Sequence, residues 1–313
     1  MKEVHQTDFM KISKEISGTI MDNSSEFQNE FFNRFKLRHA AKPIQLTESI
    51  AKNYLFPTFY ENVTCAIGIF HCSYEKAAQL VMNALHPKVK PVKMLKGRSL
   101  VAISCYEYKK VLGIKSYNEI AVAIPVMVNS NFNPPLLPMV LDKFSHFGYY
   151  IASMPVTSYE NTLRGHKIWG LPKITRQIDI ETDENFCVTT AFEESKSPYL
   201  KLKVPIKGKT TQFDVSSHLY SKLDGRLLQS KTNFKASFQV NKYMNLLFKK
   251  GVKPDQSYLE IANTPSAKVL NDLDIEEHPF QFRYAEGMSS CFDLSNQETP
   301  KWFQTLNSNL DNT

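Results

Sequence analysis

The chain has 313 residues, 42% of them hydrophobic, and 38 basic against 31 acidic residues give it a formal net charge of +7. This length and apolar content allow a sizeable buried core, in one large domain or two. The basic charge is mild, is spread along the chain and comes with no recognised reader motif, so we do not expect nucleic-acid binding.

Residues 1–55 differ from the rest of the chain and predict a helical extension. Apolar side chains recur at helical spacing in 9–20, and again at Phe27, Phe31 and Phe35. Ser25 with Gln28 resembles a capping box at the start of the second helix. We expect two short amphipathic helices packed on the main body or on a second subunit, with the three phenylalanines buried. A membrane-surface role is the less favoured alternative.

From residue 56 onward, β-strand patterns dominate. Strands are predicted at 63–70, 99–108, 117–128, 148–156, 173–182, 186–194, 199–206 and 280–294. Helices are predicted after Ser73 at 73–85, at the end of the proline-broken segment 133–144, and after a turn in 259–273. Many short strands with few helices indicate a β-rich α+β fold, closed or strongly bent and largely antiparallel. We expect an extension (1–55), a barrel domain (56–295) and a C-terminal tail (296–313).

Cysteine and histidine usage, together with the apolar runs, indicates a cytoplasmic protein. The five cysteines are odd in number and form no CxxC pair, which favours reduced, mostly buried thiols. The histidines have no metal-binding spacing, and we expect neither metal nor cofactor. The longest strongly apolar run, 120–128, is shorter than the about 20 residues that span a bilayer. The first residues lack the apolar core of a signal peptide.

The stretch "GHKIWGLPKIT" at 165–175 places Lys173 directly after a proline and among apolar or backbone-restricting residues. Pro172 fixes one backbone torsion, and Gly170 permits an unusual turn. Such a corner could hold an amine in a pocket, where burial favours the neutral, nucleophilic form. A lysine whose ammonium reaches the surface is the more common role for such a residue.

Glu119 is the second candidate, at the head of a strand in which Ile120, Val122 and Ile124 alternate with smaller residues. A carboxylate that points inward from this position could act as a general acid–base or orient a substrate. A solvated strand end is the ordinary alternative.

The order and rough spacing of "NEIAVAIPV", "GYYIASMPV" and "GHKIWGLPKIT" resemble the acetoacetate decarboxylase family, and "YLEIANTPSAKVLNDL" is similar to its late segment. The resemblance runs from about 57 to 290. It implies a cone-like β-barrel with strands in mixed directions and peripheral helices. It also implies a homo-oligomer. Lys173 then matches the family's Schiff-base lysine, Glu119 an active-site glutamate and Met154 a pocket methionine. Leu171, Trp169 and Ser104 complete the predicted substrate-binding set.

The chain departs from the family pattern at several positions. The family's second lysine is replaced by Ile174, so activation of Lys173 must rely on desolvation without an adjacent ammonium. The stretch 59–70 has no counterpart of the family arginine that holds the substrate carboxylate, and a second family glutamate aligns with Ser104. His166 and Lys167 replace the charged pair at the corner. His166 could carry protons, although a surface or structural histidine is the more common role.

The resemblance implies a Schiff-base-forming lyase that acts on a small oxo acid, with Lys173 as nucleophile and Glu119 as the acid–base or positioning group. Decarboxylation of a β-oxo acid is the default reaction. The first alternative is an aldolase or dehydratase of the same fold that uses the iminium ion without losing carbon dioxide. The second is a relative that binds small molecules in the same pocket and catalyses nothing.

Overall fold

The computed structural model of the protein describes residues 16, 20–130, 146–295 and 301–308. The segment predicted at 133–144 lies outside the described residues, as does most of the first predicted helix, 9–20. Within the described ranges, no helix is long and apolar enough to cross a membrane.

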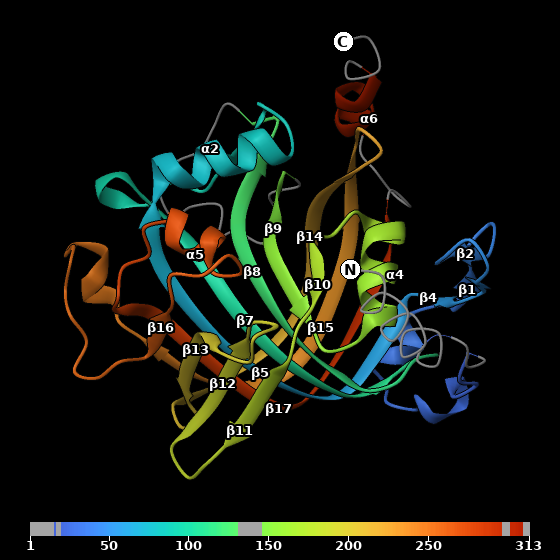
Figure 1. Cartoon of the computed structure of the whole chain (residues 1–313), viewed down its shortest axis with the longest axis horizontal. Coiled ribbons are helices and arrows are strands. Elements are labelled where there is room, and N and C mark those ends of the chain that lie inside the picture. The colour runs from blue at the N-terminus through green and yellow to red at the C-terminus, as the bar shows by residue number, and fades with distance from the viewer. Residues whose placement is uncertain (1–15, 17–19, 131–145, 296–300, 309–313) are drawn as a thin grey trace.

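Seven strands close into a barrel, seen as the curved ribbons of Figure 1. In order around the ring they are β9 (Phe147–Val156), β14 (Lys209–Leu223), β15 (Arg226–Lys242), β17 (Pro279–Ser295), β5 (Thr58–Ser73), β7 (Arg98–Val111) and β8 (Tyr117–Val128). Neighbours are antiparallel except β9 and β14, which are parallel and pair at Tyr149–Leu219 and Tyr150–Tyr220. The β8–β9 pairing completes the ring. The predicted β-rich barrel with mixed strand directions is confirmed.

Shorter strands surround the barrel. A four-stranded sheet packs against its outer surface and contains β11 (Ile178–Thr182), β12 (Phe186–Phe192), β13 (Pro198–Pro205) and β16 (Leu259–Ile261). Strand β6 (Val89–Pro91) pairs with β8, and β10 (Lys173–Thr175) lies parallel beside β9. Two small ribbons precede the barrel: β1 (Arg38–His39) with β4 (Leu55–Phe56), and β2 (Ile44–Gln45) with β3 (Ala51–Lys52).

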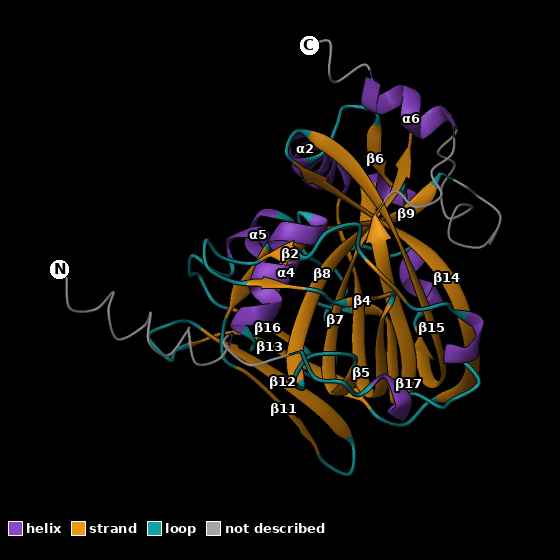
Figure 2. Cartoon of the chain, turned by 90° about the vertical axis from the view of Figure 1, so that its right-hand side faces the viewer, coloured by secondary structure: helices purple, strands orange, loops and turns teal. Residues whose placement is uncertain are grey.

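The helices of the described residues are few and short. The α-helices are α2 (Tyr74–Ala84), α4 (Tyr159–Trp169), α5 (Lys268–Asp272) and α6 (Lys301–Ser308), and the 3-10 turns are η1 (Ser24–Glu26), η2 (Phe32–Arg34), η3 (Leu95–Gly97) and η4 (Met244–Leu247). Figures 1 and 2 show α2, α5 and α6 outside the barrel. Ser73 caps α2 as predicted, because its hydroxyl accepts a hydrogen bond from the Lys76 N–H.

Strand β8 shows why the barrel is hollow. Its branched residues Ile120, Val122 and Ile124 point outward into the core that the barrel shares with α2 and the small sheet. The alternate residues point inward, since successive side chains of a strand face opposite sides. Ala121 and Ala123 are among these, and their short side chains leave space inside the barrel.

The described part of the N-terminal extension corrects the helical prediction. Phe27 and Phe31 are buried and Phe35 is half-buried, but they lie in two 3-10 turns and their flanks instead of one helix. The side chain of Asn29 accepts the Phe31 N–H, a local turn that competes with helical hydrogen bonds. The rings of Phe27 and Phe35 pack on Phe59 of β5, so tertiary contacts override helical spacing.

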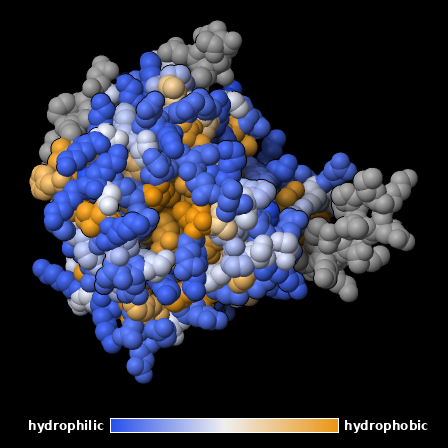
Figure 3. Space-filling model, turned by 60° about the vertical axis from the view of Figure 1, so that its left-hand side comes forward, coloured by the Kyte–Doolittle hydropathy of each residue, from blue (hydrophilic) through white to orange (hydrophobic). Residues whose placement is uncertain are grey.

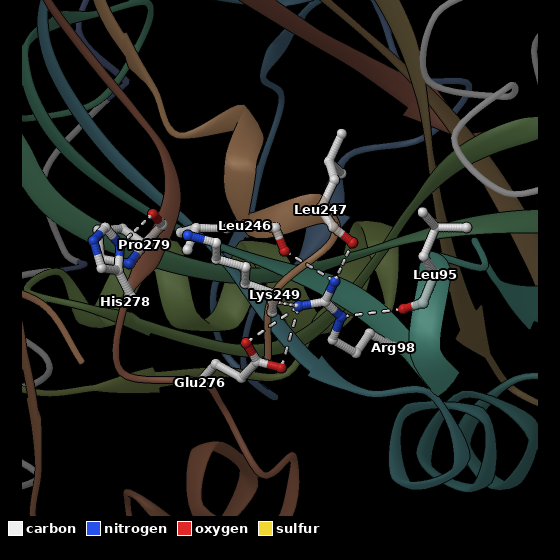
Figure 4. Close-up of polar contacts among 8 residues, drawn as sticks. All are labelled: Leu95, Arg98, Leu246, Leu247, Lys249, Glu276, His278 and Pro279. Carbon is white, nitrogen blue, oxygen red and sulfur yellow. Dashed lines mark hydrogen bonds and ion pairs between the residues drawn. The ribbon is translucent and has the colours of Figure 1, made fainter. Parts of the chain in front are cut away.

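A buried arginine fixes one end of the barrel (Figure 4). Arg98 is 1% exposed and donates to the carbonyl oxygens of Leu246, Leu247 and Lys249 at 2.7–3.0 Å. It also forms an ion pair with Glu276 at 3.3 Å. Leu246 and Leu247 belong to the same apolar cluster as two residues of the barrel interior, so this contact network, the Arg98 clamp, holds the 244–249 segment against the barrel.

The remaining surface is mostly polar. Figure 3 shows apolar side chains gathered in a recess of an otherwise hydrophilic face. All five cysteines are buried and free, as the sequence predicted. The C-terminal tail contributes Phe303, which is buried and stacks on Tyr220 of β14.

Candidate active site

Lys173 lies where α4 ends and β10 begins. Ser158 caps the start of α4, and Gly170 ends the helix in the left-handed conformation with φ 59°. A Cβ at residue 170 would lie 2.2 Å from the Lys222 carbonyl oxygen, so glycine is required there. The chain then reverses through Leu171 and the exposed Pro172, and the side chain of Lys173 enters the molecule.

Inside the barrel, Lys173 meets Glu119. The Lys173 Nζ lies 2.6 Å from Glu119 Oε2, and the two residues are 5% and 3% exposed. Tyr108 donates from its hydroxyl to Glu119 Oε1 at 3.2 Å. Burial raises the pKa of the Tyr108 phenol well above its usual value, so this donor stays protonated at neutral pH. The corner therefore presents an amine, a carboxylate and a neutral phenol in one chain of contacts.

The surroundings of Lys173 shift it toward the neutral amine. Burial lowers the pKa of Lys173, the negative charge and hydrogen bond of Glu119 raise it in part, and the positive charge of Arg164 lowers it again. Arg164 is 1% exposed and donates to Asn161 Oδ1 and Thr58 Oγ1. Desolvation is the largest of these effects, as predicted, and the guanidinium that α4 places near the amine adds to it.

Ile174 is not the group that excludes water from the amine. It follows Lys173 on β10, and successive strand residues point to opposite sides, so its side chain faces away from the Lys173 amine. Ile174 is half-buried, whereas Lys173 is buried. The desolvation comes instead from the barrel interior and from α4, whose Gly165 contacts the methylene groups of Lys173.

The interior holds a cavity of about 220 Å³. Its wall includes all six residues of the predicted site: Lys173, Glu119, Met154, Leu171, Trp169 and Ser104. Met154 is the register partner of Lys173 across the β9–β10 pair. Trp169 is also anchored, because its Nε1–H donates to the Asp293 carbonyl oxygen at 2.8 Å. A space of this size holds a small organic molecule and is far larger than one water requires.

His166 and Lys167 lie outside the cavity and are largely exposed. The His166 Nε2 contacts the Lys173 carbonyl oxygen at 2.6 Å. This contact ties the end of α4 to the start of β10, so His166 fits the structural role that was the alternative to proton transfer.

Three residues near the amine or on the cavity wall escaped the sequence reasoning. Tyr108 lies within a predicted strand, but nothing in the sequence signals that it faces Glu119. Arg164 lies directly before the 165–175 stretch and was not considered with it. Arg283 lines the cavity from β17 and carries no motif. Among the described residues, no cluster of histidine, cysteine or carboxylate side chains could hold a metal ion.

Comparison with solved structures identifies the fold. An acetoacetate decarboxylase from Legionella pneumophila is 14% identical with a TM-score of 0.52, over 76% of this chain and 86% of that chain. A second acetoacetate decarboxylase structure is 14% identical with a TM-score of 0.50, over 77% and 91%. The enduracididine biosynthesis enzyme MppR, complexed with pyruvate, is 9% identical with a TM-score of 0.51, over 76% and 90%. At these identities the likeness concerns the fold alone.

The sequence itself carries the family assignment. No curated protein matches the chain. The sequence profile of the family described as acetoacetate decarboxylase (ADC), however, matches residues 41–238, more than half of the chain. The match begins before residue 57, where the resemblance was placed, and ends before the late segment at 258–273. The chain therefore belongs to the acetoacetate decarboxylase family.

Proposed function

We propose that the protein is a Schiff-base-forming lyase in which Lys173 attacks the carbonyl carbon of an oxo acid inside the barrel. The observation that carries the proposal is the buried amine of Lys173, 2.6 Å from the Glu119 carboxylate, on the wall of the cavity inside the barrel. A lowered amine pKa supports it, because only the neutral amine is a nucleophile.

Glu119 supplies the proton transfers of imine formation. It takes a proton from the Lys173 ammonium, and the free amine adds to the carbonyl carbon. The proton then passes to the hydroxyl of the adduct, water leaves, and an iminium ion forms. Tyr108 holds Glu119 through the hydrogen bond to its second oxygen, so the carboxylate keeps one oxygen toward the amine.

The default reaction is loss of carbon dioxide from a β-oxo acid. The bond to the substrate carboxylate breaks, its electron pair moves to the iminium nitrogen, and an enamine remains. A proton adds to the enamine carbon, and water releases the product and the amine. The wall beside Lys173 supports this step, since Met154, Leu171 and Ala121 solvate a carboxylate poorly and neutral carbon dioxide well.

An aldolase or dehydratase is the second candidate. The iminium ion that accepts electrons in decarboxylation can equally stabilise an enamine formed by loss of a proton. The Glu119 carboxylate lies where it could remove that proton. The fold neighbour MppR is described as complexed with pyruvate, an oxo acid, which supports this class of substrate.

Borohydride reduction with a panel of oxo acids tests the proposal. We expect a reduced adduct on Lys173, mapped by peptide mass spectrometry, and no adduct in Lys173→Met. Lys167→Met is the matched control, because it removes an exposed lysine of the same corner and should leave the adduct unchanged. Release of carbon dioxide separates decarboxylase from aldolase. A purified chain that forms no adduct with any oxo compound would instead be a binding protein.

We also propose that residues 56–295 form the domain that carries out the reaction, with an N-terminal extension before it and a C-terminal tail after it. A homo-oligomer and a cytoplasmic location stay predictions. Light scattering of the purified chain measures the first, and cell fractionation the second.

A further inference from the structure

The side of the cavity formed by β17 carries polar groups that the proposed reaction does not use. Arg283 lines the cavity, and its Nε is buried without a hydrogen-bond partner. Gln281, two residues earlier, is 5% exposed, and its Nε2 is also buried and unpartnered. A buried donor left without a partner is unfavourable, so two of them on one strand call for an explanation.

Strand pairing puts both side chains on the inner face of β17. Arg283 is the register partner of Ile67 and Gln281 that of Ile69, and both isoleucines line the cavity. The intervening Phe282 points the other way, into the outer core. Arg283 and Gln281 also contact each other, since Arg283 Nη2 donates to Gln281 Oε1 at 3.4 Å. Both unpartnered N–H groups therefore belong to one polar patch on the inner wall.

This patch has positive charge without a protein counter-ion. In the described part of the chain, no carboxylate lies within ion-pair distance of Arg283. Its guanidinium stacks instead on Phe213, with the central carbon 4.9 Å from the ring centroid. A buried arginine normally pairs with an anion, and its planar fork suits a carboxylate. Gln281 is not among the residues that line the cavity, but its amide oxygen accepts from the Arg283 guanidinium and so helps to position it.

The patch is separated from the reacting amine. Arg283, Ile67, Ser104 and Ala121 form one cross-strand row, whereas Glu119 lies in the next row along β8. Strands β5 and β7 separate β17 from β8, which is roughly 14 Å around the wall at about 4.8 Å per strand. Because a β-oxo acid has one carbon between its carboxylate and its carbonyl group, a longer oxo acid matches the two positions better.

We propose that Arg283, held by Gln281, binds a carboxylate of the substrate that is remote from the carbonyl group attacked by Lys173. The substrate is then an extended oxo acid, and this inference rests on the proposed function for the role of Lys173. The carboxylate held at Arg283 is not the one released, because the group lost as carbon dioxide must lie on the carbon next to the iminium carbon at Lys173.

A non-reacting ligand tests the anion site independently of imine chemistry. Calorimetry should show heptanoate binding at least about tenfold more tightly than heptanamide, the effect of one charged hydrogen-bonded contact. In Arg283→Gln this preference should fall to near unity, and in Gln281→Leu it should fall in part. Arg34→Gln, which removes a surface arginine, is the control and should keep it. Equal preference in the wild type and a folded Arg283→Gln protein, or no preference in the wild type, overturns the inference. Arg283→Lys keeps the charge and should retain part of the preference.

A reacting ligand connects the anion site to Lys173. Borohydride labelling of Lys173 should be about tenfold faster with 6-oxoheptanoate than with its methyl ester, and Arg283→Gln should remove this difference while labelling by the ester stays unchanged. Labelling without a preference for the acid would overturn the remote-carboxylate site and leave the lyase proposal intact. Heptanoate binding through Arg283 without labelling by any oxo compound would overturn the lyase proposal and, with it, the assignment of Lys173, while the anion site would stand.

Discussion

The side chain of Lys173 lies directly across the α-carbon of Gly165. A Cβ at residue 165 would be 2.5 Å from Lys173 Cδ and 2.7 Å from its Cγ, closer than carbon atoms approach in folded proteins. The helix α4 thus offers its bare backbone as a surface that directs the lysine toward Glu119. The requirement for glycine at position 165 comes from this close approach of the Lys173 side chain.

Gly165→Ala should therefore impair imine formation more than folding. The added methyl group displaces the Lys173 side chain, and a misplacement of about 1 Å can reduce a rate about 100-fold. Borohydride labelling of Lys173 measures the effect. Gly225→Ala is the control, because it places alanine at φ 80° in an open hairpin turn and costs about 1 kcal/mol in stability without touching the cavity. Normal labelling in Gly165→Ala would show that the lysine can shift freely.

Glu119→Gln should separate imine formation from turnover. The Glu119 charge and hydrogen bond raise the pKa of Lys173 against the lowering effect of burial, so their removal should lower that pKa further. The pH profile of Lys173 labelling should move to lower pH, while turnover should fall by about 10²–10⁴ through loss of proton transfer. A profile that moves to higher pH would contradict the assigned direction.

Arg164→Gln should have the opposite effect on the amine. Its positive charge lowers the pKa of Lys173, so a neutral residue should move the labelling profile to higher pH. Ile174→Lys is the informative comparison, since it adds an ammonium group beside Lys173 in sequence but on the opposite side of β10. It should shift the profile less than Arg164→Gln does. A larger shift from Ile174→Lys would place that side chain near the amine after all.

His71 should make the stability of the fold depend on acid pH. The residue is fully buried with both ring nitrogens unpartnered, and it contacts Phe280. Burial and then the nearby Arg98, which pairs with Glu276, lower its pKa from 6.5 to about 4. The folded state therefore binds fewer protons than the unfolded state between these values. Stability present above pH 6.5 is lost as the pH falls toward 4, by at most about 3 kcal/mol.

His71→Phe keeps the packing and removes the titrating group. Urea unfolding at a series of pH values should show a shallower loss of stability below pH 6.5 in this variant. Parallel curves for the two proteins would mean that other groups cause the acid sensitivity.

Much of the barrel was predictable because its strands are apolar on at least one face. The strand predicted at 117–128 coincides with β8, and 148–156 falls within β9. The hairpin of β14 and β15 was missed, although Asp224 and Gly225 form its turn with positive φ values. Much of β14 is at least partly exposed and rich in polar side chains, so its alternation was weak.

Helix α4 was missed for a related reason. Its buried face contains Glu160, Asn161 and Arg164, which a hydrophobic pattern does not register as a core. Glu160 is satisfied by Lys52 and Tyr54 from the N-terminal ribbons, so the burial depends on partners about a hundred residues away.

The site residues that could be predicted are those that a local sequence pattern marks. The Pro172–Lys173 corner and Glu119 stand out in the sequence, and the structure brings them together. Arg283 shares the cavity with Lys173 because the last barrel strand in the sequence pairs between β15 and β5, a relationship that no local pattern encodes. The charge near Lys173 was missed because sequence adjacency suggested Ile174, whereas helical geometry supplies Arg164.

The Arg98 clamp anchors a segment that packs behind one part of the cavity wall. Leu246 and Leu247 share an apolar cluster with Ile69 and Leu100, and these last two residues also line the cavity. The carbonyl groups held on Arg98 fix the backbone of this segment, independently of its side chains. A change of side chain at Leu246 or Leu247 would therefore alter the packing behind Ile69 and Leu100, while the backbone of the segment, the amine and its carboxylate stay in place.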